Sequence, residues 1–379
     1  MERRDDAQTY TKVMKLPGLK TLDLYIIRKF LGTYLFAIAI IIVILVVFDT
    51  AEKMDDFIEM KAPFSKIAFQ YYLNFIPFFI NQFSGLFTFI AVIFFTSKLA
   101  SRTEIIAMLA GGVSFHRLMW PYFLSAAVIA GMSLFLSLSV IPAANLQRVD
   151  FEQRYLKRFQ NTSVDRHIYR QIRPGVFLYI RDYSPVDNKA KYIAIEQYQG
   201  NTLIGSTEAA DVSLDPQTQH WSAPRYIHRL IDPVTLRETF ERRQGLDTLL
   251  NLQTEELGRV EELVKTMNIV ELSRFISQQK SKGSDMVEIF EVERQSRFTY
   301  PMATFILTLI GVSISSRKVR GGIGLHIGIG LGLGSSYILI GRFAEEFAKG
   351  GVLPAVVSMW LPNVIFLGFA LYLYIKAPK

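Results

Sequence analysis

A short charged segment between two long apolar runs holds the side chains with the clearest chemical spacing. Ser101 and Glu104 fit the S-x-x-E pattern of a capping box, in which both side chains bond backbone N–H groups at a helix start. Gly111 and Gly112 would end that helix, because glycine readily adopts the left-handed cap conformation. The spacing therefore predicts a short helix over about residues 101–111.

Two roles are open for this helix. In one, Glu104 pairs with a basic residue of a cytosolic partner while neighbouring apolar side chains fill a groove on that partner. In the other, the segment is a structured turn on the membrane surface, and Glu104 is used by its own cap. The docking role would involve Arg102, Glu104, Ile105, Met108 and Leu109.

Patterns typical of the common enzyme classes are absent from the sequence. The five histidines have no HExxH spacing, there is no cysteine, and no GxxxxGK P-loop occurs. Disulfides, thiolate metal sites and ATP binding by a P-loop of this chain are thereby excluded. We expect a chain that is not an enzyme, with no catalytic residue, no metal site and no cofactor of its own.

Apolar runs dominate both ends of the chain, and half of the 379 residues are hydrophobic. A helix needs about 20 apolar residues to cross the hydrocarbon of a membrane. Six runs approach that length, which predicts an α-helical membrane protein with six spans: 30–48, 67–95, 118–141, 298–314, 323–340 and 352–375.

Basic residues cluster beside alternate ends of these runs, as the positive-inside rule expects of membrane proteins. The net charge of +8 is therefore explained by membrane orientation rather than by nucleic-acid binding. The basic residues lie before the first run, after the second and fourth, and at the end of the chain. The positive-inside rule then places both termini and the segment around 101–111 in the cytoplasm, and the polar middle outside. We expect a multi-pass membrane protein that does not bind nucleic acid.

The polar middle of the chain is predicted to be an inserted all-β domain. Short runs rich in β-branched and aromatic residues alternate with turn signals, which suggests a sandwich or a jelly roll. A helical connector over about 266–297 follows. The predicted boundaries are 1–141 for the first three spans, 142–297 for the β domain with its connector, and 298–379 for the last three spans.

Small residues repeat every four positions along the fifth run and would form a smooth stripe on one helix face. Such a stripe is typical of close packing between membrane helices. It also fits a sliding or gating seam against another subunit, and the two roles are compatible. The stripe comprises Gly324, Gly328, Gly332 and Ser336.

An amphipathic pattern continues past the first apolar run in "FDTAEKMDDFIEM". This stretch either extends the first span as a helix that lines a route for an amphiphile, or is a solvated face. Further along the chain, Arg342 precedes Glu345 and Glu346 by three and four residues, the spacing of local ion pairs.

Several stretches resemble the LptF/LptG permease family, also called YjgP/YjgQ, and together cover nearly the whole chain. The segment around Glu104 is similar to the family pattern S-E-[LI]-x-x-M-x-A-x-G-x-S-x-x-R, with a threonine inserted before the glutamate. The last stretch is closer to LptG than to LptF. The stretches that carry the resemblance are LDLYIIRKFL, SRTEIIAMLAGGVSFHRLMWP, IPAAN, LDPQTQHW and GGVLPAVVSMWLPNVIF.

This resemblance implies one membrane half of an ABC transporter that extracts lipopolysaccharide from the inner membrane of a Gram-negative envelope. The implied partners are an LptF-like permease subunit, an LptB-type ATPase dimer, an LptC-like membrane-anchored protein and lipopolysaccharide itself. The external domain would be a β-jellyroll that receives the lipid. The loop helix would be the coupling helix that docks into the ATPase, with Glu104 as the matching glutamate.

One departure concerns the phosphates of the lipid. Where LptG proteins often carry lysines near the outer end of the first span, this chain has Asp49, Asp55 and Asp56. The phosphate-binding role therefore cannot be transferred by position, and Lys53 is the nearest cation. The candidate lipid-contact residues are Lys53, Phe57, Lys61 and Arg342.

Other functions stay open from the residues alone. The chain could be the LptF-like partner of the same complex, or a permease of a different ABC lipid or lipoprotein exporter. Two alternatives from other functional classes are an intramembrane enzyme and a scaffold. The lack of any catalytic pattern counts against the enzyme, and an ATPase that co-purifies with the chain would favour transport.

Overall fold

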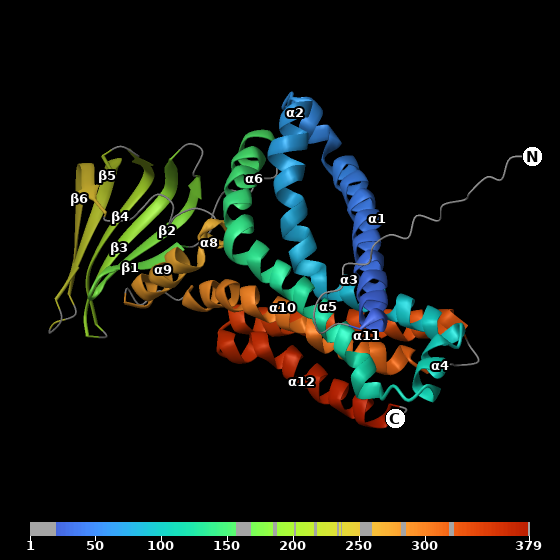
Figure 1. Cartoon of the computed structure of the whole chain (residues 1–379). Helices are drawn as coiled ribbons and strands as arrows, with labels where there is room; N and C mark the ends of the chain where they lie inside the picture. Colours follow the sequence, from blue (N-terminus) through green and yellow to red (C-terminus); the bar gives the residue numbers. More distant parts are fainter. Residues whose placement is uncertain are drawn as a thin grey trace, which may run out of the picture.

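The computed structural model of the chain shows a helical bundle with a β-sheet beside it (Figure 1). The sheet joins the bundle through two short helices at one end. The structure describes residues 20–156, 168–184, 188–200, 202–215, 218–232, 235, 237–250, 260–281, 286–317 and 322–377.

Long helices make up the first half of the chain. The first of them continues well past its apolar run, so "FDTAEKMDDFIEM" is helical almost to its end, as one of the two alternatives predicted. These elements are α1 (Thr21–Glu59), α2 (Phe64–Lys66), the π-helical turn η1 (Ile67–Tyr72), α3 (Leu73–Ser101), α4 (Glu104–Ala110), α5 (Phe115–Phe135), the π-helical turn η2 (Leu136–Val140) and α6 (Ile141–Tyr155).

The second half of the chain returns from the sheet to the bundle. Its helices are α8 (Val260–Thr266), α9 (Ile269–Ser281), α10 (Val287–Ser315), α11 (Gly322–Lys349) and α12 (Ala355–Lys376). In the described part of the chain, six helical segments are long and apolar enough to cross a membrane, three on each side of the sheet in sequence. The predicted layout of three spans, a β domain and three spans is confirmed.

Helix α10 is the centre of the bundle and contacts α3, α5, α11 and α12. Glycines allow the close approach to α3: a Cβ placed on Gly311 would lie 2.8 Å from Val92 Cγ1, and one on Gly85 3.3 Å from Leu307 Cδ1. In the most apolar stretch of α10, 72% of the residues are buried within the chain, against 17% in α1 and 17% in α11. Helices α1 and α11 therefore present most of their surface to lipid or to another chain.

The β-sheet has six antiparallel strands in sequence order. Each connection is short, so each strand pairs with the next along the chain, and the described strands form a meander rather than the Greek-key order of a jelly roll. The prediction of a β domain is confirmed, and its finer form as a jelly roll is not. The strands are β1 (Ile168–Arg173), β2 (Val176–Ser184), β3 (Lys189–Gln199), β4 (Thr202–Leu214), β5 (His220–Ile231) and β6 (Glu238–Leu249).

Alternating side chains give the sheet one buried face. Leu178 and Ile180 of β2 are fully buried, and Ile180 lies opposite Ile193 of β3. Trp221 of β5 completes this core and packs against the ring of Tyr183, with 6.0 Å between ring centroids. The period-two pattern of the sequence therefore found the strands correctly.

Candidate functional site

Helix α4 and the two ends of its loop form the first candidate site. The helix closes in a Schellman motif: the N–H of Val113 donates to the Met108 carbonyl at 3.2 Å, and the N–H of Gly112 to the Leu109 carbonyl at 3.0 Å. Gly112 has a φ of +84°, so a glycine supplies the predicted left-handed cap. Ser114 Oγ then accepts the backbone N–H of Arg117 at 3.2 Å and begins α5.

The predicted capping box at the start of α4 is wrong. Ser101 is still the last residue of α3, and its hydroxyl donates to the Lys98 carbonyl at 2.9 Å. Helix α3 runs beyond the apolar residues, and the chain then turns at Thr103, whose φ of +60° is left-handed. Helix α4 therefore begins at Glu104, too late for Ser101 to cap it.

Glu104 has a partner that the sequence did not indicate. Its Oε2 accepts a hydrogen bond from the hydroxyl of Tyr25 in the second turn of α1, at 2.9 Å. Two more contacts tie the same end of the bundle together. Both guanidinium nitrogens of Arg117 donate to the buried carboxylate of Asp23, at 2.8 and 2.6 Å. His116 Nδ1 lies 3.0 Å from the hydroxyl of Tyr374 at the end of α12.

The outward face of α4 differs from the predicted docking face. Ile105 is 1% exposed and packs into the main core of the bundle, so it cannot fill a groove on a partner, and its predicted role needs correction. Met108 and Leu109 are half-buried against the same core. Helical periodicity instead turns Ile106 outward, 48% exposed, beside the exposed Arg102.

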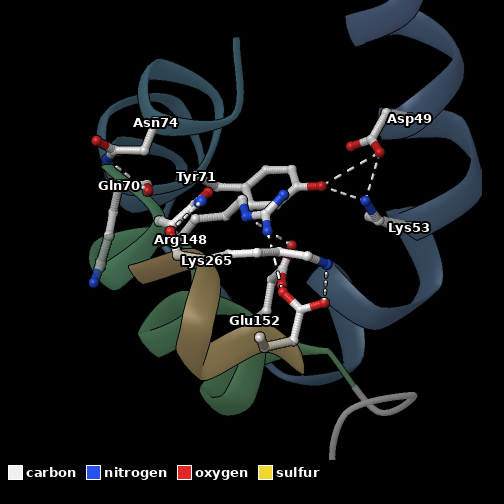
Figure 2. Close-up of polar contacts among 10 residues, drawn as sticks. Asp49, Lys53, Gln70, Tyr71, Asn74, Arg148, Glu152 and Lys265 are labelled. Atoms are coloured by element: carbon white, nitrogen blue, oxygen red, sulfur yellow. Dashed lines mark hydrogen bonds and ion pairs between the residues drawn. The ribbon is translucent and has the colours of Figure 1, made fainter. Parts of the chain in front are cut away.

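A polar cluster at the far end of the bundle forms the second candidate site (Figure 2). Lys53 of α1 donates to Asp49 one turn earlier, and it also hydrogen bonds the hydroxyl of Tyr71 in η1. The same ammonium lies 4.8 Å from the centre of the Tyr71 ring. Tyr72 donates to the other oxygen of Asp49 at 3.1 Å. Both tyrosines come from the π-helical turn, a form frequent at functional sites.

The other predicted lipid-contact residues lie in different surroundings. Phe57 is 5% exposed and packs edge-on against Tyr71 and Phe151, with ring centroids 6.2 and 6.0 Å away, so it cannot contact a lipid from there. Lys61 is exposed in the turn after α1. Arg342 of α11 is 3.0 Å from Glu345, the local ion pair that its spacing indicated.

A second part of the cluster joins the helical connector to the spans (Figure 2). The buried Arg148 of α6 lies 3.4 Å from Glu262 of α8, and Lys265 bonds the same carboxylate at 3.0 Å. The amide of Asn145 donates to the Lys265 carbonyl at 3.0 Å. Arg297 of α10 donates to the carbonyl of Val264, also in α8, at 3.2 Å. Helix α8 is thus held by both halves of the bundle.

Two faces of α11 carry glycines, and they serve different purposes. A Cβ on Gly330 would lie 2.3 Å from Ile93 Cδ1, and one on Gly334 2.8 Å from Leu86 Cδ1, so these two glycines allow α11 to pack on α3. A Cβ on any of the three glycines of the predicted stripe would meet no heavy atom within 4 Å in the described part of the chain. That exposed face comprises Gly324, Gly328, Gly332 and the adjoining Ser336.

Neither site contains a group of described side chains arranged as catalytic residues or metal ligands usually are. Among the described residues, no three His, Asp or Glu side chains group as metal ligands would. Hydrogen bonds, ion pairs and aromatic contacts make up both sites, and these can bind a polar group or transmit a movement. The sequence found α4 and Lys53, but it gave no signal for Tyr25 or Tyr71, because both are distant along the chain from the residues they bond.

Comparisons with known proteins identify the family. The sequence matches the family described as "Lipopolysaccharide export system permease LptF/LptG" over residues 24–376, which is nearly the whole chain. A search of the curated proteins found no match.

Proposed function

The chain belongs to the LptF/LptG family of lipopolysaccharide export permeases, and from this premise we propose that it is the LptG-type subunit of an ABC transporter. In this proposal it extracts lipopolysaccharide from the inner membrane and passes it toward the outer membrane. The match over both helical halves and the sheet carries the proposal. The ending "GGVLPAVVSMWLPNVIF" supports LptG over LptF.

The exposed faces of α1 and α11 support a cavity shared with an LptF-like subunit. These two helices bury the smallest share of their apolar stretches within the chain. The smooth face at Gly324, Gly328 and Gly332 lets another helix approach closely. Acyl chains in such a cavity are shielded from water, and exposing them would cost roughly 0.8 kcal/mol per methylene. Because a tightly held lipid leaves slowly, its release requires an energy source.

An LptB-type ATPase dimer would supply that energy through α4. A docking partner can reach the exposed Ile106 of α4 and the exposed Arg102, which lies just before this helix. Movement of α4 would pass to α1 through the hydrogen bond between Glu104 and Tyr25. Since α1 lines the proposed cavity, this contact links ATPase closure to a shift toward a cavity that holds lipid less well.

The sheet would receive the lipid on the periplasmic side and pass it to an LptC-like protein. Basic residues at the α4 end of the bundle support a cytoplasmic position for that end and for both termini. The β-sheet then lies on the periplasmic side of the inner membrane. Helix α8, which both halves of the bundle hold, would keep the sheet beside the exit of the cavity.

Purification of the assembled complex tests this proposal. We expect the tagged chain to co-purify with an ATPase that carries its own P-loop, and with a second permease subunit. Reconstituted with lipopolysaccharide, the complex should release lipid only when ATP is hydrolysed, and a substitution of the P-loop lysine in the ATPase should stop the release. Release that continues without ATP hydrolysis, or a chain that never assembles with an ATPase, would contradict the proposal.

A further inference from the structure

A groove of about 400 Å³ lies over α10, between the start of α5 and the end of α12. Its walls are mostly apolar. Met119 and Leu309 form the buried floor, while Trp120 and Leu371 are 58% and 48% exposed at its edges. The volume falls within the range of about 300–1,000 Å³ for pockets that bind small molecules.

One end of this groove is polar. There the His116 ring meets the hydroxyl of Tyr374, 3.0 Å away, and the guanidinium of Arg117 lines the same end. Arg117 remains 35% exposed although it is paired with Asp23. The exposed indole of Trp120 lies one helical turn along α5, and tryptophan is enriched where the hydrocarbon meets the headgroups. The groove is therefore amphipathic along its length.

Charge around the groove is positive. Its three bordering segments, residues 113–126, 305–317 and 360–377, contain two arginines, a lysine and a histidine but no aspartate or glutamate. Arg317, two residues after the end of α10, donates to the carbonyl of Lys376, which follows Tyr374 by two residues. The ammonium of Lys376 itself lies against the neighbouring Tyr372. The carboxylate of Asp23 compensates Arg117 only.

We propose that this groove binds an anionic phospholipid of the surrounding leaflet. One acyl chain lies along Trp120, Phe123 and Leu371 and packs against these apolar side chains. The phosphate lies at the polar end beside His116 and Arg117, and the exposed Arg317 and Lys376 at the same end of the bundle attract it at longer range. A zwitterionic lipid fits the apolar part equally well but gains no net attraction from these charges. The anionic headgroup is therefore what the site selects.

Quenching of tryptophan fluorescence by brominated lipids tests the proposal on the full chain in vesicles. The Trp360→Phe variant leaves Trp120 as the tryptophan on the spans, and Trp221 is enclosed in the sheet. A Trp120→Phe/Trp360→Phe variant gives the background. We expect dibrominated phosphatidylglycerol to quench Trp120 with an apparent affinity about fivefold higher than dibrominated phosphatidylcholine, the effect of one basic residue near an anionic lipid.

A matched pair of charge variants separates the groove from general surface charge. Arg317→Gln/Lys376→Gln should bring the two affinities together, because these cations lie at or just past the ends of two helices that line the groove. Arg28→Gln/Lys29→Gln, two exposed cations on α1, should preserve the difference. Equal quenching by both lipids in the parent would overturn the proposal. The proposal would also be overturned if both charge variants lost the affinity difference to the same extent. Quenching no higher than the background would overturn it too, because protein would then cover the groove.

Discussion

Glu104 has a third role besides capping its own helix or binding a partner. Its carboxylate accepts the hydroxyl of Tyr25, 79 residues earlier, and this bond links α4 to α1. The carboxylate has further acceptor positions, so this bond does not prevent it from meeting a basic residue of an ATPase. Intrachain linkage and docking are therefore separable by mutation.

Two variants at this bond should behave differently. Glu104→Arg should abolish ATPase-linked lipid release, because it reverses the charge on the proposed docking helix. Tyr25→Phe removes only the intrachain hydrogen bond, worth about 1 kcal/mol, and should leave the ATPase bound while it weakens the coupling of hydrolysis to release. ATP hydrolysis and lipid release, measured together in the reconstituted complex, check both. Normal release by Glu104→Arg would rule out the docking role.

Phe57 is a structural residue at the outer end of α1. Phe57→Ala should lower the free energy of unfolding by about 3–5 kcal/mol, because it leaves a cavity between Tyr71 and Phe151. The neighbouring Ile58 is 68% exposed, so Ile58→Ala should change stability by less than about 0.5 kcal/mol. Denaturation of both variants in detergent gives the comparison. Equal stability of the two would mean that the aromatic cluster does not hold α1.

At the scale of elements, α11 presents two glycine faces with different neighbours. Gly330 and Gly334 meet α3 inside the chain, whereas the face with Gly328 is open. Both faces repeat at the spacing of helix packing, so the repeat alone does not tell which one packs within the chain. The open face is available to the second permease subunit that we propose.

Substitution on these two faces should separate folding from assembly. Gly330→Ala should destabilise the isolated chain by about 1–3 kcal/mol, because its Cβ overlaps Ile93. Gly328→Leu should leave the isolated chain as stable as the parent and should reduce co-purification of the second permease subunit. Thermal stability of the chain and recovery of the complex are the two measurements. Unchanged assembly and transport in Gly328→Leu would show that this face of α11 does not pack against the second subunit.

At the scale of the whole molecule, α8 follows the sheet in the chain and is bonded to both halves of the bundle. Backbone carbonyls of this helix accept from Asn145 on α6 and from Arg297 on α10. Both side chains are buried, and a buried polar group without a partner is costly, so the attachment resists separation of its parts. A movement of the spans would therefore carry α8 with it.

Adjacent residues of β5 point to opposite faces of the sheet and provide a matched test of lipid transfer. Tyr226 lines a groove of about 480 Å³ on one face, while Ile227 is 37% exposed on the other. A photocrosslinking residue at position 226 should capture lipopolysaccharide during ATP-driven transport, and one at 227 should not. Capture at neither position, with a working control at the cavity, would show that the lipid does not pass along this face.

Sequence reasoning found the elements of this protein because their signals are local. Apolar runs of about 20 residues, period-two alternation and a terminal glycine each report the conformation of neighbouring residues. The six spans, the strands and the cap at Gly112 were predicted for that reason. The capping box at Ser101 failed because α3 continues through Ser101 and the chain turns at the left-handed Thr103 before α4 begins.

Tertiary structure decided which of these residues are free and which are already bonded. The partner of Glu104, the enclosure of Phe57 and the choice of packing face on α11 all depend on residues far apart in the chain. Those contacts form only when the helices pack, and packing is governed by shape and burial rather than by spacing along one helix. Local patterns along the chain are therefore enough to predict six membrane spans around a β domain. The packing of the chain determined which surfaces remain for lipid and for partners.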